Sequence, residues 1–282
     1  MASKIHVNVT NEYGTLKSVL VATANNYFDH DPINDNQTIY YKKSPPDKKK
    51  LLLQQEAFFD VLRKHNVSLV FSKSLDDCPD QLNTRDPSFV IGNTFFVSSM
   101  KESLRKKEKE GLVEIINTLD ANIVYLDDCT IEGGDVIVAD KTVFVGVSRR
   151  TTHEGVQKLE SHLGNAYQVV PIELKQGYLH LDTVFNVLSE KLALVCKSAI
   201  KEESFERIKQ YYSVIDISLD EQLHLGTNVL SVAPKVVISQ KYNERINNEM
   251  RKHGYEVIEL DYSEAAKLGG AFRCGTCPLE RV

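Results

Sequence analysis

The stretch VIVADKTVFVGV, residues 136–147, gives the clearest indication of the fold. It consists of two short apolar runs with the turn residues Asp140 and Lys141 between them. Two apolar runs around such a turn are typical of an antiparallel hairpin of buried strands. An amphipathic helical pattern follows at residues 152–162, and YQVVPI then forms a third apolar run. The stretch therefore predicts a unit of two strands, a helix and a third strand.

The same unit recurs on both sides of this stretch. FVIGNTFFV turns at Gly92-Asn93 and precedes a predicted helix at 101–119 and the strand IVYL. TVFNVLSEKLALVC turns at Glu190-Lys191 and precedes a helix at 202–211 and the strand VIDI. NVLSVAPKVVIS turns at Pro234-Lys235 and precedes a helix at 243–253 and the strand VIEL.

A fifth, partial copy lies at the start of the chain. GTLKSVLVATANN predicts a strand, and a long polar excursion then runs to Tyr41. A helix is expected from Ser44 to Asn66, followed by a buried strand in VSLVFS. Because one such unit cannot bury its own sheet faces, the copies must pack on one another. We expect a single α/β domain, residues 1–282, made of five such units.

Composition excludes several classes of protein. The 282 residues carry a net charge of -5, which argues against a nucleic-acid partner because phosphates demand a basic face. No apolar run approaches the roughly 20 residues that cross a bilayer, and the N-terminus lacks the apolar run of a signal peptide. Five cysteines without regular spacing favour a reduced protein. We expect a cytoplasmic protein without a membrane partner.

Five polar residues stand at equivalent places, in the loop between each third strand and the next hairpin. They are Asp86, Glu132, His180, Asn228 and Cys274, and their spacings are 46, 48, 48 and 46 residues. Each has an ordinary structural explanation alone: a turn cap, a tight loop, a core histidine, a turn asparagine. Equivalent positions in a cyclic array lie around one axis, so these side chains should meet in one pocket.

Cys274 has three interpretations. It could be a small buried hydrophobe, or it could pair with Cys277 in a CxxC site for metal or redox chemistry. Cys78, Cys129 and Cys196 stand alone, however, and too few residues follow Cys277 to build the helix of a thioredoxin-like motif. The common register of the five loops favours the third interpretation, a catalytic nucleophile.

Together these residue types suit cleavage of a guanidinium group. Two carboxylates that face one point repel each other unless a cation lies between them, and a guanidinium pairs bidentately with carboxylates. A thiolate can attack its central carbon. A histidine can then protonate the departing nitrogen and later take a proton from water.

Motifs along nearly the whole chain resemble those of the guanidino-group modifying enzymes of the pentein superfamily, which include arginine deiminases, dimethylarginine dimethylaminohydrolases and amidinotransferases. The matching stretches are NEYGTLKSVLV, TRDP, EGGDV, SRRT, HLDTVFN and GGAFRC, in the family's order. The resemblance implies a five-bladed pseudo-symmetric α/β propeller of five ββαβ units around a central axis.

The resemblance also implies roles for individual residues. The family's nucleophile corresponds to Cys274, its histidine to His180, and its guanidinium-binding acids to Asp86, Glu132 and Asp182. An arginine that binds the substrate carboxylate corresponds to Arg150. Arg85 and Asp135 are further motif positions, and we expect Arg85 and Asn228 to contribute to substrate binding.

This chain also departs from the deiminases. They have an arginine just before the double glycine, where Leu268 stands here, and a large helical insertion that is absent from this chain.

We therefore expect a hydrolase that cleaves a guanidinium C–N bond of arginine or a methylated arginine through a covalent thiouronium on the cysteine. The alternatives are an amidinotransferase, which passes the amidino group to an amine, and a non-catalytic binding protein on the same fold. The expected partner is a small guanidino compound. We expect no metal and no cofactor, and we leave open whether the chain forms a homodimer.

Overall fold

The structure is a computed structural model that describes residues 4–282, and it has a mixed α/β fold. Five three-stranded sheets and one two-stranded sheet form within these residues. In each three-stranded sheet the middle strand pairs antiparallel with one neighbour and parallel with the other. The five sheets therefore share one topology, as the repeated hairpin predicts.

Four of the sheets each come from one continuous stretch of chain. The first of these contains β4 (Ser88–Ile91), β5 (Thr94–Val97) and β7 (Asn122–Tyr125). The next contains β8 (Val136–Ala139), β9 (Thr142–Val147) and β10 (Gln168–Glu173), with α4 (His153–Leu163) before its third strand. The third contains β11 (Phe185–Val187), β12 (Leu192–Val195) and β13 (Ser213–Asp216), with α5 (Glu202–Tyr211). The fourth contains β14 (Leu230–Ala233), β15 (Val236–Gln240) and β16 (Glu256–Leu260), with α7 (Glu244–Lys252).

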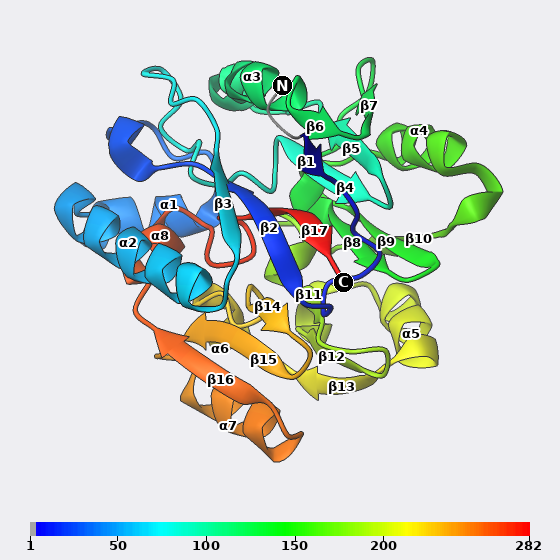
Figure 1. Ribbon diagram of the computed structural model, residues 1–282. Coiled ribbons are helices and arrows are strands. Elements are labelled where there is room, and N and C mark those ends of the chain that lie inside the picture. Colours follow the sequence, from blue (N-terminus) through cyan, green and yellow to red (C-terminus); the bar gives the residue numbers. More distant parts are fainter. Residues whose placement is uncertain (1–3) are drawn as a thin grey trace.

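The remaining three-stranded sheet joins the two ends of the chain. β2 (Leu16–Val21) and β3 (Ser68–Phe71) come from the N-terminal part, with α2 (Lys48–Lys64) between them, and β17 (Cys277–Arg281) adds the antiparallel neighbour of β2. Figure 1 shows β17 beside β2 near the middle of the molecule. The first copy looks partial in the sequence because its missing strand lies at the other end of the chain.

The structure corrects the helix that we expected at 101–119. A 3-10 helix, η2 (Ser103–Leu112), is followed by the short α3 (Val113–Ile116), and β6 (Leu119–Asp120) then pairs with β1 (Ile5–His6). In a 3-10 helix residues three apart eclipse one another. This geometry stacks the buried ion pair of Arg105 and Glu108 on the inner face of η2.

Two further expectations for the first copy need correction. The N-cap of α2 is Asp47, whose side chain accepts from the Lys50 amide, so the helix begins after Pro45 and Pro46 rather than at Ser44. The strand expected to be buried, β3, is only half-buried because it is an outer strand of its sheet.

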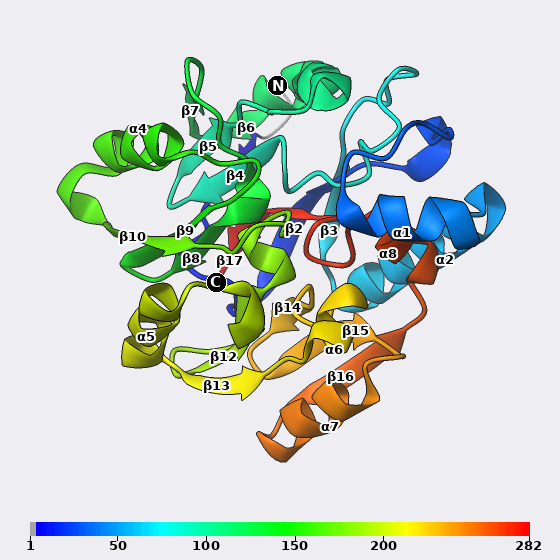
Figure 2. The same cartoon turned by 180° about the vertical axis from the view of Figure 1, so that it is seen from behind.

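Several short helices were not predicted. They are η1 (Ala24–Asn26) and α1 (Asp35–Lys43) in the polar excursion, and η3 (Gly133–Asp135), η4 (Gly164–Ala166), η5 (Leu181–Thr183), η6 (Lys197–Ala199), α6 (Leu219–Leu223) and α8 (Ser263–Lys267) elsewhere. In both views α1 packs beside α8, so the excursion lies near the chain's last loop (Figure 2).

The middle of the molecule lies between the five sheets, and the larger helices α2, α4, α5 and α7 lie toward the outside (Figures 1 and 2). Four clusters of buried apolar side chains fill the spaces around the sheets. No helix in residues 4–282 has the length and apolar character needed to cross a membrane.

Candidate active site

Backbone and side-chain hydrogen bonds link the five predicted loops into a closed ring. The Gly133 amide donates to the Asp86 carbonyl at 2.9 Å, and the Leu181 amide donates to Asp135 Oδ1 at 2.8 Å. Three further bonds continue the ring: Thr227 Oγ1 to the Asp182 carbonyl (2.9 Å), the Cys274 amide to Asn228 Oδ1 (3.1 Å), and the Arg85 amide to the Cys274 carbonyl (3.1 Å). The five residues predicted from their register therefore come together.

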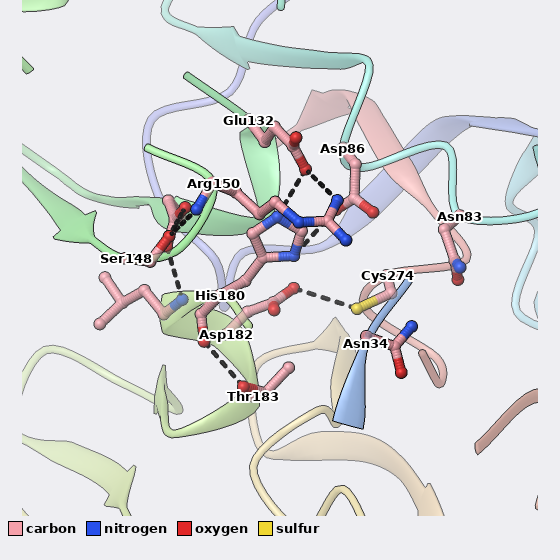
Figure 3. Close-up of polar contacts among 12 residues, drawn as sticks. Asn34, Asn83, Asp86, Glu132, Ser148, Arg150, His180, Asp182, Thr183 and Cys274 are labelled. Atoms are coloured by element: carbon pink, nitrogen blue, oxygen red, sulfur yellow. Dashed lines mark hydrogen bonds and ion pairs between the residues drawn. The ribbon is translucent and has the colours of Figure 1, made fainter. Parts of the chain in front are cut away.

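Cys274 lies in a turn closed by the bond from the Gly275 amide to the Ala271 carbonyl. Its thiol is buried, with Sγ 3.0 Å from Asn228 Nδ2 and 3.4 Å from Asp182 Oδ2. Figure 3 shows the contact with Asp182. Burial and the nearby carboxylates of Asp182 and Asp86 raise the pKa of the Cys274 thiol well above its usual value. The thiol is therefore protonated at neutral pH when no ligand is bound.

His180 stands between two carboxylates. Its Nε2 lies 2.7 Å from Glu132 Oε2, and its Nδ1 lies 3.6 Å from Asp86 Oδ1. Burial disfavours the imidazolium, but the charges of Asp86 and Glu132 outweigh burial and raise the pKa of His180. Gly134 permits this packing, because a Cβ there would lie 2.8 Å from His180 Nδ1. The histidine can therefore hold a proton at Nδ1, which is buried and has no hydrogen-bond partner in residues 4–282.

Both oxygens of Glu132 are already occupied. Oε1 accepts from the Lys101 amide at 3.0 Å, and Oε2 accepts from His180 and from Arg150 Nη1, the latter at 3.3 Å. Burial opposes ionisation, but His180 and Arg150 lower the pKa of Glu132. Glu132 is thus an ionised partner of His180.

Asp86 and Asp182 each use one oxygen and leave the other free. Arg105 Nη1 donates to Asp86 Oδ2 at 2.6 Å, and Arg273 Nη1 donates to Asp182 Oδ2 at 2.8 Å. Asp86 Oδ1 and Asp182 Oδ1 are buried and have no hydrogen-bond partner in the described part of the chain. Buried polar atoms are rarely left unpaired, so these two oxygens are candidate ligand contacts.

Arg150 places its guanidinium among the acids rather than at the surface (Figure 3). Besides Glu132, it donates from Nη2 to the Ile33 carbonyl at 2.9 Å. The SRRT loop is held by Ser148, whose hydroxyl accepts from the Arg150 amide and donates to Asp135 Oδ2 at 2.7 Å. Burial raises the pKa of Asp135 to about 7. Because Asp135 accepts from Ser148 and from the Leu181 amide, it connects the SRRT loop to the loop of His180.

Arg85 and Asn228 are brought to Cys274 in different ways. Asn228 contacts the thiol directly, and its Oδ1 also accepts from the amides of Ala271 and Cys274. The Arg85 side chain instead lies 3.7 Å from Glu12 and makes no ion pair with Asp86. Of these two predicted substrate-binding residues, only Asn228 has a side-chain contact with the nucleophile.

Three charged residues of the site escaped the sequence reasoning. Arg105 lies in the lysine-rich stretch at 101–111, whose interleaved charges are typical of a solvated face, yet it is buried on Asp86. Glu12 and Arg273 lie within the motifs NEYGTLKSVLV and GGAFRC, but no role was predicted for either. Both are buried in the charge network beside Asp182. The spacing of Arg105 and Glu108 by three residues is the one local signal for a buried pair.

The polar excursion covers one side of the site. Asn34 Nδ2 donates to the Leu268 carbonyl at 3.0 Å, and Asn36 Nδ2 donates to the carbonyls of Leu223 and Ala266 at 3.2 Å. A cavity of about 270 Å³ is lined by residues of the excursion and of neighbouring loops, among them Asn34, Leu179 and Gly269. The cavity therefore adjoins the loops of His180 and Cys274.

Asp86, Glu132 and His180 could also be considered as metal ligands, because one donor atom of each lies within 4.8 Å of the others. The guanidinium groups of Arg105 and Arg150, however, already pair with Asp86 and Glu132. Two adjacent cations make this donor set a poor site for a divalent ion.

Sequence comparisons identify relatives of this chain. The family model described as N,N dimethylarginine dimethylhydrolase, eukaryotic, matches residues 24–281. The uncharacterized protein YkgA of Bacillus subtilis is 39% identical over 96% of this chain and 94% of its own. An arginine deiminase of Bacillus thuringiensis is 28% identical over 73% of this chain, and the match spans only 63% of the deiminase.

Solved structures share the fold. The amidinotransferase SxtG of Microseira wollei superposes with a TM-score of 0.84 at 18% identity, covering 98% of this chain and 97% of that one. The dimethylarginine dimethylaminohydrolase (DDAH) of Pseudomonas aeruginosa, a cysteine-to-serine mutant complexed with citrulline, superposes with a TM-score of 0.81 at 21% identity, covering 93% and 99%. With the family model matching most of its length, the chain belongs to the dimethylarginine dimethylhydrolase family of the pentein superfamily of guanidino-modifying enzymes.

Proposed function

We propose that this protein hydrolyses a guanidinium C–N bond of arginine or a methylated arginine, with Cys274 as the nucleophile. One observation carries the proposal. Asp86 Oδ1 and Asp182 Oδ1, two buried carboxylate oxygens without hydrogen-bond partners in residues 4–282, belong to the residues that contact His180 and Cys274. A guanidinium placed between them would satisfy both oxygens and balance their charge.

The cationic substrate also activates the thiol. In the free protein burial and the two aspartates raise the pKa of Cys274, which favours the neutral thiol. A guanidinium bound between the aspartates cancels this repulsion and lowers the pKa of the thiol. The nucleophile is therefore formed only when a substrate is present.

The reaction then proceeds in two halves. The thiolate forms a C–S bond with the guanidinium carbon while the proton on His180 Nδ1 passes to the departing nitrogen, so the C–N bond breaks and an amine leaves. Neutral His180 then takes a proton from water, whose oxygen bonds to the same carbon as the C–S bond breaks. As the C–S bond breaks, the sulfur takes the remaining proton of that oxygen, which leaves a urea-type product such as citrulline and the Cys274 thiol. His180 is again an imidazolium, and the proton that the thiol first released to solvent is taken up by the departed amine.

The remaining residues support these steps. We assign Glu132 to holding His180 protonated and correctly oriented, because both of its oxygens are already in use. We assign Arg150 to the carboxylate of the substrate, in line with the SRRT motif. We further propose that the five sheets are the blades of one pseudo-symmetric propeller that forms a single catalytic domain around this site.

Transfer to an amine is the second candidate, and the likeness to the amidinotransferase SxtG over nearly the full length of both chains favours it. A transferase must keep water from the covalent intermediate and admit a second substrate. Here the polar excursion is bonded onto the loops of the site and leaves a cavity of only about 270 Å³ beside them. This arrangement favours water as the acceptor.

A substrate panel tests the proposal. The purified protein is incubated with arginine, methylated arginines and other guanidino compounds in H₂¹⁸O, with and without excess glycine or ornithine, and products are identified by mass spectrometry. We expect a urea-type product that carries ¹⁸O whether or not an amine is added, and none from Cys274→Ser. A new guanidino compound that forms only with the amine would establish transfer, and no turnover of any compound would overturn the enzyme assignment.

A further inference from the structure

Arg273, which directly precedes the nucleophile, is buried and connects two acids from distant parts of the chain. Its Nη1 donates to Asp182 Oδ2 and its Nη2 donates to Glu12 Oε1, both at 2.8 Å. Nη2 also donates to the Val136 carbonyl at 2.8 Å. One planar guanidinium is therefore fixed by two carboxylates and a backbone carbonyl.

Glu12 binds one terminal nitrogen of this guanidinium, Nη2, while Asp182 binds the other. Burial opposes its ionisation, but Arg273 and Arg85 lower the pKa of Glu12 to about 2, so it is charged at any working pH. A planar guanidinium that is bound through both Nη1 and Nη2 cannot rotate freely, unlike the flexible ammonium of a lysine. Glu12 thus fixes the direction in which Arg273 presents Nη1.

The consequence for Asp182 is geometric. Arg273 holds Oδ2 at a place 3.4 Å from Cys274 Sγ, and this fixes the plane of the carboxylate. Asp182 Oδ1 then remains as the buried oxygen without a hydrogen-bond partner in residues 4–282. Without the arginine, the carboxylate could turn, and its charge beside the thiol would be unbalanced.

We infer that Arg273, anchored by Glu12, is a positioning residue that holds Asp182 in the orientation needed to bind the guanidinium beside Cys274. The inference rests on the proposed function, since it concerns the same substrate site. Arg273 contacts Asp182 rather than the reacting atoms, so it acts through that carboxylate.

Ligand binding separates positioning from simple electrostatics. The Kd of arginine is measured by calorimetry in Cys274→Ser, alone and combined with Arg273→Gln. Removal of a positive charge near a cation-binding site should tighten binding if only charge matters. Loss of the orientation of Asp182 should instead weaken it about tenfold, as for one hydrogen bond to a charged group. Unchanged or tighter binding in the Arg273→Gln combination would overturn the inference.

Two further variants sharpen this experiment. Arg273→Lys keeps the charge but not the fork, so we expect arginine binding between that of the parent and that of Arg273→Gln. Arg281→Gln is the matched control, because Arg281 is equally buried but donates to the Gly14 carbonyl and makes no ion pair with Asp182. Arginine binding in Arg281→Gln should equal that of the parent, and an equal loss there would assign the effect to a general loss of packing.

A second measurement does not require a guanidino substrate. The charged groups that act on the thiol are Asp182 and Asp86, which disfavour the thiolate, and Arg273, which favours it. The pH midpoint for alkylation of Cys274 by iodoacetamide, followed by peptide mass spectrometry, should rise by about one pH unit or more in Arg273→Gln and return in Arg273→Lys. If Cys274→Ser binds no guanidino compound, the proposed function fails. The pH midpoint of alkylation still tests whether Arg273 acts on the Cys274 thiol and on Asp182. An unchanged midpoint in Arg273→Gln would overturn the inference.

Discussion

Cys274 and Cys277 lie three residues apart and are both buried, yet their side chains contact different groups. Cys274 contacts the polar groups of Asn228 and Asp182, which come from loops of two other units. Cys277 begins β17 and packs in an apolar cluster with Leu20 and Leu279. Burial and residue type do not distinguish the two thiols, whereas the loop that carries each one does.

This difference shows how a repeat fold separates chemistry from packing. Loops between successive sheets meet at the middle of the molecule, where their polar side chains contact one another. Three residues after Cys274 the chain enters strand β17, where alternate side chains must fill the core. Four predictions challenge or refine the contrast between the two cysteines.

The largest expected effect is on the nucleophile itself. Cys274→Ser should lower turnover by about a million-fold, because a missing nucleophile removes the covalent route. Cys277→Ser should retain most of the activity per folded molecule. The measurement is steady-state turnover of the best guanidino substrate, with circular dichroism to confirm folding. Comparable losses in both variants would end the distinction between the two thiols.

The second prediction concerns Glu132, the carboxylate partner of His180. Glu132→Gln removes the charge that raises the pKa of His180, so His180 loses its proton at lower pH and the alkaline limb of the kcat profile moves to lower pH. We expect kcat to fall about a hundredfold at about pH 8. Glu102→Gln is the matched control, because Glu102 lies 3.5 Å from Arg150 Nε and makes no contact with His180. The same shift in the control would contradict the role of Glu132.

Arg150 should have a smaller and selective effect. If it binds the substrate carboxylate, Arg150→Ala should lower kcat/KM for arginine about tenfold or more, because one charged hydrogen bond is lost. A guanidino compound without a carboxylate should be affected less. Arg149→Ala changes the exposed neighbouring arginine, which pairs with Asp35, and should leave this preference intact. An unchanged preference in Arg150→Ala is evidence against the assignment.

The smallest effect should be on stability. Cys277→Ser places a hydroxyl in an apolar cluster, where the thiol lies 3.9 Å from the Pro278 carbonyl oxygen, too far for a hydroxyl hydrogen bond, and should lower the free energy of unfolding by about 1–3 kcal/mol. Urea denaturation at neutral pH measures the change. The parallel value for Cys274→Ser should be smaller, because Asn228 and Asp182 offer the new hydroxyl hydrogen-bond partners. A larger loss of stability at Cys274 would reverse the contrast.

Much of the fold could be predicted from local pattern. The hairpin turns at Gly92, Asp140 and Lys235 coincide with residues of positive φ between paired strands, and α5 has the predicted bounds. The helix at 101–119 was wrong because a lysine-rich stretch does not reveal that Arg105 and Glu108 turn inward. The site was predicted as a set of five loop residues, but not the partners that orient them.

Local periodicity predicts the repeat, the register of the five loops and therefore the meeting of Asp86, Glu132, His180, Asn228 and Cys274, because strands and helices are patterns of neighbouring residues. Which carboxylate oxygens remain free is a property of the folded chain. That choice depends on partners far apart in sequence: Arg273 joins Asp182 to Glu12, and β17 completes the sheet of β2. Ion pairs and sheet edges depend on distance in space, which a periodic pattern does not encode.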